Sequence, residues 1–205
     1  MVENIQWLGH DTFKIVGEKV IYTDPYQIKE RGKADLILIT HCHFDHCSPE
    51  DIAKVAGPQT TIVLPLDCDP KYKGTVQTIS PGESINVKGI PIEAVPAYNT
   101  NKNFHPKSNN WVGYVFTVNG QRIYIAGDTD YIAEMKNLGN IDVAIVPVSG
   151  TYVMTASEAA RAVLDIKPKV AIPMHYGTIV GSIADAKTFA DKLKGKVEVV
   201  ILKAP

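Results

Sequence analysis

A chain of 205 residues is long enough for one well-buried core and too short for two large independent domains, so we expect a single domain over residues 1–205. Hydrophobic residues make up 45% and charged residues 21%, and a net charge of −1 argues against general attraction to nucleic acid or to acidic membrane surfaces. The chain has no secretion signal at its start, no apolar run long enough to span a bilayer and no C-x-x-C pair among its three cysteines, so we expect a cytoplasmic protein with reduced thiols.

The first half of the chain is predicted to consist mainly of short strands joined by turns. Apolar patterns between turn signals indicate the following strands: 5–8, 12–16, 20–23, 34–39, 60–64, 75–79, 84–87 and 90–95. One helix interrupts them. It begins after Ser48, which can cap its first turn, and ends before Gly57, and Asp51 is placed to complete a capping box with Ser48.

The second half is predicted to alternate strands and helices. The strands expected there are 111–118, 122–126, 143–146, 170–173 and 197–202. Asn119 and Gly120 join the first two of these in a tight hairpin. Three helices are expected from their cap residues, with these limits: Asp130 to Gly139, Thr155 to Ile166 and Ser182 to Gly195.

Three histidines and one aspartate fall within six residues, directly after the apolar strand 34–39: His41, His43, Asp45 and His46. His41 and His43 are two residues apart, so on an extended backbone both rings leave the same face and can bind one ion. Asp45 and His46 lie in the turn beyond, which suits a second ion. The alternative is a set of hydrogen-bonded surface residues, and it is disfavoured because packing four titratable side chains together is costly unless a cation neutralises them.

Two further candidate ligands also follow short apolar strands. Asp128 comes after strand 122–126, and His175 comes after strand 170–173. If these strands lie beside strand 34–39, their ends meet at one edge of layered sheets, where ligand sites commonly lie. The sequence therefore predicts a metal site assembled from distant parts of the chain.

These residues resemble the metallo-β-lactamase superfamily. The segment THCHFDH has its H-x-H-x-D-H signature, YTDP carries its early acidic residue Asp24, AGDTD carries its bridging aspartate, and PMHYG carries its last histidine. The resemblance implies an α+β fold, a four-layer αββα sandwich with a binuclear metal site at one edge. It also implies the following ligands: His41 and His43 for the first metal, Asp45, His46 and His175 for the second, and Asp128 as the bridge.

The third histidine of the first metal departs from the pattern of the resemblance. Many relatives place it just after the strand that corresponds to residues 92–97, where this chain has Asn99. His105 is the remaining histidine nearby, and we expect it to be the ligand. The alternative is that His105 lies on the surface and that Asn99 or water completes the site.

Several other residues are candidates for roles around the metals. His10 resembles a feature of the small lactonase-like and phospholipase-D-like branch, where it lies near the metal rim, although a plain hydrogen-bonding role is equally compatible with the sequence. Asp24 is expected to orient a ligand histidine from behind, and Asp45 to aim the nucleophile as well as bind metal. The candidate substrate-binding residues are Lys102, Lys107, Trp111 and Tyr176, against the alternative of a solvated loop.

The resemblance implies a metal-dependent hydrolase with two divalent ions, zinc first and iron or manganese as alternatives. A hydroxide held between the metals would cleave a small ester, lactone or phosphodiester, and the positive cluster favours an anionic substrate. One alternative is a nuclease of the same superfamily, although the chain has no basic stripe. Another is a non-hydrolytic protein that uses the site for iron redox chemistry or folding. The expected partner is a small-molecule substrate, with neither a membrane nor nucleic acid, and a homo-oligomer is compatible with the sequence.

Overall fold

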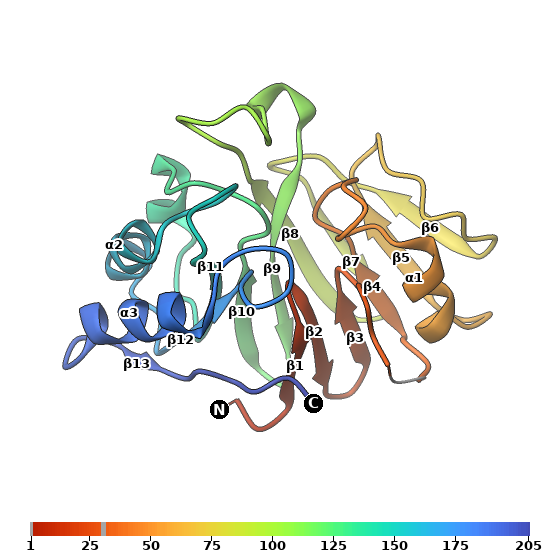
Figure 1. The fold of residues 1–205 in the computed structure, drawn as a ribbon. Coiled ribbons are helices and arrows are strands. Elements are labelled where there is room, and N and C mark those ends of the chain that lie inside the picture. Colours follow the sequence, from red (N-terminus) through yellow and green to blue (C-terminus); the bar gives the residue numbers. More distant parts are fainter. Residues whose placement is uncertain (1, 30–31) are drawn as a thin grey trace.

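The computed structural model describes residues 2–29 and 32–205, whose strands form two β-sheets packed face to face (Figure 1). The first sheet has this order: β1 (Ile5–Gly9), β2 (Thr12–Val16), β3 (Val20–Thr23), β4 (Leu36–Leu38), β5 (Thr61–Leu64) and β6 (Thr75–Thr78). The second has this order: β13 (Glu198–Val199), β12 (Val170–Met174), β11 (Val143–Pro147), β10 (Gln121–Ile125), β9 (Val112–Val118), β8 (Ile90–Pro96) and β7 (Ser84–Val87). Strands β3 to β6 are parallel, as are β10 to β13, so in each group the carboxyl ends share one edge.

Helices cover the outer faces of both sheets. Helix α1 (Pro49–Val55) packs on the first sheet, whereas α2 (Ala156–Ile166) and α3 (Ile183–Leu193) pack on the second, at the opposite side of the molecule (Figure 1). Two short 3₁₀ helices, Lys107–Asn109 and Ala133–Asn137, lie in the connections. The order helix, sheet, sheet, helix confirms the predicted α+β sandwich with four αββα layers.

Strand β4 shows why the sequence folds into this sandwich. Its side chains alternate between two cores: Leu36 and Leu38 pack between the sheets, whereas Ile37 and the following Ile39 pack beneath α1. A strand buried on both faces needs an uninterrupted apolar run, which this segment provides. The same burial fixes where the chain leaves the sheet, at Thr40, and therefore where the histidines that follow can lie.

Most of the predicted elements are confirmed, including the hairpin of β9 and β10 and the cap residues Thr155 and Ser182 that open α2 and α3. The predicted role of Asp51 in a capping box with Ser48 is wrong. Ser48 does cap α1, but the Asp51 carboxylate accepts hydrogen bonds from the backbone N–H groups of Gln27 and Ile28, at 2.9 and 3.1 Å. These two tertiary donors take the place of the Ser48 backbone N–H, and the Ser48 hydroxyl still donates to the Asp51 carboxylate at 2.9 Å.

The α-helix predicted between Asp130 and Gly139 is also wrong. That segment contains only the 3₁₀ helix Ala133–Asn137, because Asp130 does not cap it. Its carboxylate instead accepts hydrogen bonds from the backbone N–H of Thr100 at 2.8 Å and from the ammonium of Lys102 at 2.5 Å. The final strand β13 is shorter than predicted, since it pairs only with β12 at the edge of the sheet.

The structure bears on two further expectations. Within the described residues, none of the helices combines the length and the apolar character that crossing a bilayer requires. All three cysteines, Cys42, Cys47 and Cys68, are free thiols, as the sequence predicts. Cys42 donates a hydrogen bond to the carboxylate of Asp67, at an S···O distance of 3.4 Å, so its thiol does not point toward the neighbouring histidines.

Tyr114 on β9 links the two sheets through a buried hydrogen bond, in which its hydroxyl donates to the carbonyl oxygen of Ile39 at 2.7 Å. We expect Tyr114→Phe to lower the free energy of unfolding by about 1–3 kcal/mol in urea denaturation, because it removes one partner of a buried pair. Tyr124 on β10 is a matched control, since its buried hydroxyl has no hydrogen-bond partner among the described residues. Tyr124→Phe should therefore be neutral or stabilising. A Tyr114→Phe variant as stable as the parent would contradict this account.

Candidate metal centre

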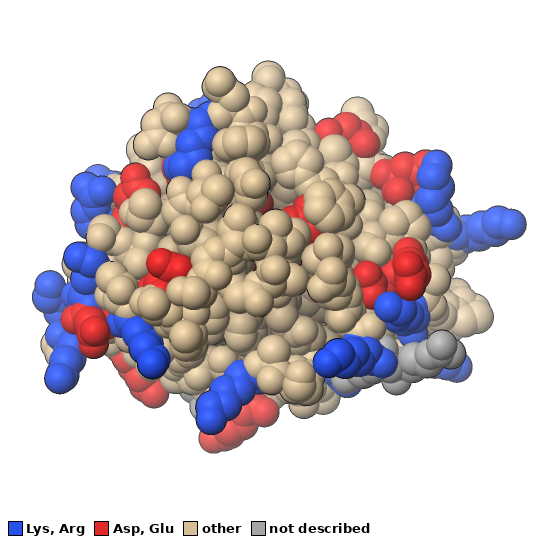
Figure 2. All heavy atoms as spheres, viewed as in Figure 1, with Lys and Arg blue, Asp and Glu red and all other residues tan. Residues whose placement is uncertain are grey.

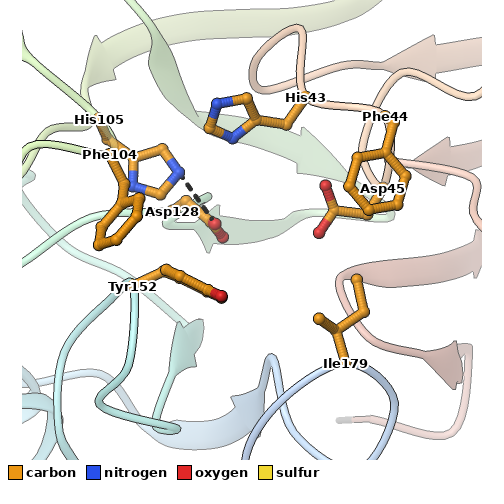
Figure 3. A pocket seen from close by; sticks show the side chains of 8 residues that line it. All are labelled: His43, Phe44, Asp45, Phe104, His105, Asp128, Tyr152 and Ile179. Carbon is orange, nitrogen blue, oxygen red and sulfur yellow. Dashed lines mark ion pairs between the residues drawn. The ribbon is translucent and has the colours of Figure 1, made fainter.

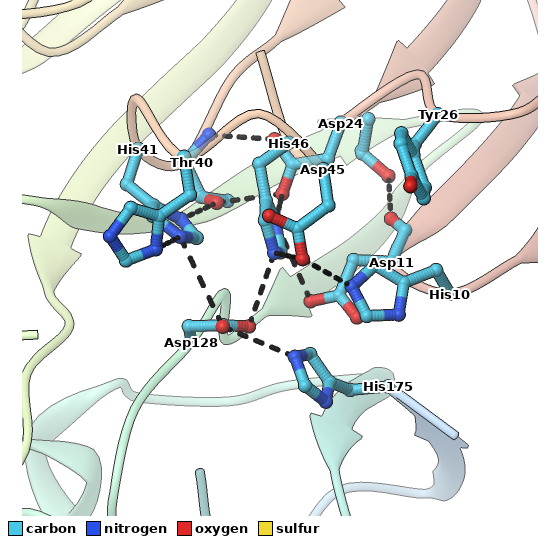
Figure 4. Close-up of polar contacts among 12 residues, drawn as sticks. His10, Asp11, Asp24, Tyr26, Thr40, His41, Asp45, His46, Asp128 and His175 are labelled. Atoms are coloured by element: carbon cyan, nitrogen blue, oxygen red, sulfur yellow. Dashed lines mark hydrogen bonds and ion pairs between the residues drawn. The ribbon is translucent and has the colours of Figure 1, made fainter. Parts of the chain in front are cut away.

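Five segments of the chain bring the predicted ligands and His10 together where strands of both sheets end (Figure 3 and Figure 4). They contribute as follows: the β1–β2 turn gives His10; the segment after β4 gives His41, His43, Asp45 and His46; the β8–β9 loop gives His105; the end of β10 gives Asp128; and the end of β12 gives His175. The two parallel strand groups therefore place side chains that are distant in sequence at one edge of the sandwich, as the sequence predicted.

One group of ligand atoms consists only of imidazoles. His41, His43 and His105 each offer a ring nitrogen, and these nitrogens all lie within 4.8 Å of one another. His41 Nε2 lies 3.1 Å from His43 Nδ1. His105 Nε2 is 3.2 Å from Asp128 Oδ2, so the group borders this carboxylate. Three imidazoles and one carboxylate oxygen form a donor set that suits a divalent transition metal.

Asn99 supports His105 rather than replacing it. The side-chain oxygen of Asn99 accepts a hydrogen bond from the backbone N–H of His105 at 3.0 Å and lies 3.1 Å from His105 Nδ1. The Asn99 amide in turn donates to the backbone carbonyl of Tyr152 at 2.9 Å. These contacts leave His105 Nε2 directed at Asp128. His105 is only 1% exposed, so the structure does not place it on the surface.

A second group of ligand atoms lies on the other side of Asp128. His10, Asp45, His46 and His175 each offer one atom, and these atoms also lie within 4.8 Å of one another. Asp128 approaches this group through both oxygens, with Oδ1 3.6 Å from His46 Nε2 and Oδ2 3.2 Å from His175 Nε2. Asp128 thus lies between the two groups, where a bridging ligand would lie (Figure 3 and Figure 4).

The buried polar atoms of this cluster are consistent with bound cations. Among the described residues, His46 Nε2, His105 Nε2 and Asp128 Oδ1 are buried without a hydrogen-bond partner. Leaving buried polar atoms unpaired costs free energy, and so many of them rarely converge without a ligand. Metal ions would satisfy all three atoms at once, so the residues fit the metals that the resemblance implies.

Asp24 and Thr40 hold two of the histidines from behind. The Asp24 carboxylate is buried and accepts hydrogen bonds from the backbone N–H of Thr40 at 2.8 Å, from the Thr40 hydroxyl at 2.6 Å and from His46 Nδ1 at 2.9 Å. Because the Thr40 hydroxyl donates to Asp24, it can accept from His41 Nδ1, which lies 3.0 Å away. Both rings are thereby fixed with Nε2 free to bind metal, the arrangement expected for ligands oriented by a carboxylate.

The centre contains one buried carboxylate that the sequence did not predict. Asp11 is fully buried, and neither of its oxygens has a hydrogen-bond partner among residues 2–29 and 32–205. It can offer a ligand atom within 4.8 Å of those of Asp128 and His175, and its Oδ2 is 4.0 Å from His46 Nδ1. The only signal in the sequence is its position next to His10. Ser149, whose hydroxyl is 2.9 Å from His175 Nδ1, was also missed, since nothing marks it locally.

Nearby carboxylates raise the pKa of two of the histidines, His46 and His175. Burial by itself would lower the pKa of His175, but Asp128 and Asp11 raise this pKa to about 9. Burial likewise opposes the charged form of His46, whose pKa is nevertheless raised well above its ordinary value by Asp128 and Asp24. A metal ion competes with these protons, because a histidine ligand must be neutral.

The structure does not bring the two candidate lysines to the ligand cluster. The ammonium of Lys102 is paired with the carboxylate of Asp130 at 2.5 Å. The ammonium of Lys107 is paired with that of Glu134 at 3.0 Å and lies over the ring of Tyr98. Both loop lysines therefore fasten the loop to the 129–134 segment, and neither is positioned to bind a substrate at the metals.

Trp111 and Tyr176, the other two candidate substrate-binding residues, are buried. Trp111 is 5% exposed and packs against three candidate ligands: His41, His43 and His105. Its indole N–H donates to Asp67 at 2.8 Å, so it positions these imidazoles and has little surface to offer a substrate. Tyr176 is 3% exposed and packs on Trp7, with a ring-centroid distance of 4.7 Å.

A pocket of about 340 Å³ opens onto the centre. Four candidate metal-site residues, His43, Asp45, His105 and Asp128, line it together with four others: Phe44, Phe104, Tyr152 and Ile179 (Figure 3). Its volume lies at the lower end of the range for small-molecule sites. The cluster is therefore accessible to a small substrate, and its walls are apolar and aromatic.

Comparison with known proteins identifies the family of the chain. Residues 4–175 match the family model of the β-lactamase superfamily domain. The chain belongs to the metallo-β-lactamase superfamily. This family membership confirms the resemblance seen in the sequence.

Individual relatives show which kind of protein within the superfamily this chain is. A UPF0173 metal-dependent hydrolase from Thermococcus onnurineus is 36% identical over 217 aligned residues, which cover 97% of this chain and 96% of that protein. One from Thermoplasma acidophilum is 36% identical over 205 residues, with 92% and 90% covered. A solved structure from Parabacteroides distasonis has a TM-score of 0.87 at 36% identity and covers 98% of this chain and 93% of that one. The protein is thus a metal-dependent hydrolase of the superfamily.

Asp24→Ala removes the acceptor that holds His46 and Thr40 in place. We expect the affinity of the centre for zinc to fall about 10–100-fold, measured by competition with a chromophoric chelator. Asp51→Ala is the matched control, because Asp51 is likewise a buried carboxylate that accepts backbone hydrogen bonds, from Gln27 and Ile28, but these partners do not hold ligands. It should lose stability and keep its zinc affinity. Unchanged zinc affinity in Asp24→Ala would show that Asp24 does not orient the ligands.

Proposed function

We propose that this hydrolase holds two divalent metal ions and cleaves a small carboxylic ester, lactone or phosphodiester. The observation that carries the proposal is the position of Asp128 between two separate groups of ligand atoms. One group, all imidazole, would hold the first ion, and the other, of mixed imidazole and carboxylate, the second. Nitrogen and oxygen donors suit zinc, and they also suit iron and manganese.

Each candidate ligand has a distinct place in this proposal. The first ion would be held by His41, His43 and His105, the second by Asp45, His46 and His175, and both by Asp128. When bound, such ions would supply a water of lowered pKa as the nucleophile and would polarise the carbonyl or phosphoryl oxygen of the substrate. No serine or cysteine nucleophile is then needed.

Asp45 and His10 form a pair that can guide the attacking water. His10 Nε2 lies 3.0 Å from Asp45 Oδ2. Burial lowers the pKa of His10 to about 4, so its ring is neutral near pH 7 and donates one N–H to Asp45. Although burial would raise the pKa of Asp45, the hydrogen bond from His10 helps to hold that pKa below its ordinary value. Asp45 is thus an ionised carboxylate at the pocket wall that can accept a hydrogen bond from water.

The charge of the centre favours negative charge on the reacting group. Two dications carry more positive charge than the carboxylates of Asp45 and Asp128 offset, and the remaining ligands are neutral imidazoles. A phosphodiester has such a charge from the start, and an ester or lactone develops it as water adds to the carbonyl. The proposal therefore covers these three classes of substrate.

The test is turnover of a methyl ester, a γ-lactone and a phosphodiester by protein loaded with zinc, iron or manganese and by chelator-treated protein. We expect at least one class to be hydrolysed only by loaded protein. Asp128→Asn should lower kcat about 100-fold or more, because it weakens a ligand shared by both ions. Asp165→Asn, which alters a partly exposed carboxylate on α2 that is paired with Lys136 and does not line the pocket, should keep full turnover and serves as the control. Fully loaded protein that cleaves none of the three classes would overturn the proposal.

A further inference from the structure

The pocket over the centre has an apolar rim that the metal chemistry does not require. We define this rim as Phe44, Phe104, Tyr152 and Ile179. Phe44 is 69% exposed, Phe104 is 51% exposed and Ile179 is 39% exposed. Large apolar side chains are usually exposed singly on a soluble protein, and a group of them around a cavity indicates a binding surface.

Two aromatic pairs stand on opposite sides of the pocket. Phe104 packs edge to face against Tyr152, with ring centroids 4.7 Å apart. Phe44 packs in the same manner against Tyr26 at 5.8 Å. Figure 3 shows Phe44 beside Asp45 on one side and Phe104 with Tyr152 on the other, with the carboxylate of Asp128 between them. A neighbouring ring supports each phenylalanine, so both walls can remain in place when the pocket is empty.

The described residues that line the pocket offer no cation to a charged substituent. Lys and Arg are absent from the described residues that line it. The two lysines of the neighbouring loop already pair with carboxylates, Lys102 with Asp130 and Lys107 with Glu134. In Figure 2 the Lys and Arg side chains of the visible face lie toward its outline. Any attraction for negative charge is therefore confined to the metals.

We infer that the substrate carries an uncharged aryl or branched-alkyl group next to the bond that is cleaved. This inference rests on the proposed function, since it describes the part of the substrate that the metals do not contact. Water leaves the rim and the apolar group when they meet, which supplies binding energy that does not depend on the reacting group. An uncharged aryl ester or a lactone with an apolar substituent has this form, whereas a substrate with a second anionic group does not.

The test compares three carboxylates as product-like ligands of the zinc-loaded protein, with calorimetry as the readout. Phenylacetate differs from acetate by a phenyl group, and malonate differs from acetate by a second charge. We expect phenylacetate to bind about 10-fold or more tightly than acetate, and malonate no more tightly than acetate. Malonate binding as tightly as phenylacetate would overturn the inference.

Two variants test whether the rim is responsible. Phe44→Ala and Phe104→Ala should each lower the affinity for phenylacetate several-fold and leave the affinity for acetate unchanged. Val76→Ala is the control, because Val76 is also an exposed apolar residue, at 38%, but belongs to the edge strand β6 and not to the pocket. Unchanged phenylacetate binding in both phenylalanine variants would overturn the assignment of the rim.

Hydrolysis assays separate this inference from the proposed function. Methyl phenylacetate and the monomethyl ester of malonate are compared with the loaded protein. Cleavage of both with equal kcat/KM would overturn the inference and support the proposed hydrolysis. Phenylacetate binding through the rim, without cleavage of any ester, lactone or phosphodiester, would support the apolar site and overturn the proposed hydrolysis.

Discussion

The carboxylate of Asp128, buried among imidazoles, is the constraint on which the rest of the structure depends. Its Oδ2 lies 3.2 Å from a ring nitrogen of both His105 and His175, and its Oδ1 lies 3.6 Å from His46. So many titratable groups share a buried space only if positive charge offsets the carboxylates. Protons on His46 and His175 can supply this positive charge. Metal ions can supply it and also bind the ring nitrogens, which already converge.

The backbone is held in unfavourable conformations at the same place. His10, Asp24 and His175 all have positive φ angles, of 50°, 37° and 59°. Residues other than glycine adopt this region at a cost, and such residues concentrate at functional sites. Here the cost is met by the two-sheet scaffold, which fixes the strand ends, and by local bonds such as that from the His175 N–H to the His10 carbonyl at 3.2 Å. The strain in these turns is therefore consistent with a functional role for the residues they position.

The parts of the site that the sequence predicted are those with a local pattern. The H-x-H-x-D-H spacing and the apolar strands before Asp128 and His175 are visible in the chain itself, so the family, the fold and the convergence of these residues followed from them. Features that depend on tertiary partners were harder to predict from the sequence. The loop with Lys102 and Lys107 has no periodic pattern, and its two lysines form ion pairs with Asp130 and Glu134, which follow a different strand.

Other features of the site had no signal strong enough to decide them. The sequence left His105 and Asn99 as alternatives, and only the folded loop shows that one holds the other. Asp11 is a single acidic residue in a turn, which sequence patterns cannot distinguish from a solvated one. The apolar rim is assembled from four separate loops, so its side chains resemble ordinary loop residues until the pocket brings them together.

The central claim is that Asp128 joins two metal sites in one centre. The most direct measurement is the metal content per chain, by elemental analysis of protein purified without chelator and again after reconstitution. The account predicts about two equivalents of a transition metal, one for each group of ligands. One equivalent or less that persists after reconstitution would contradict it.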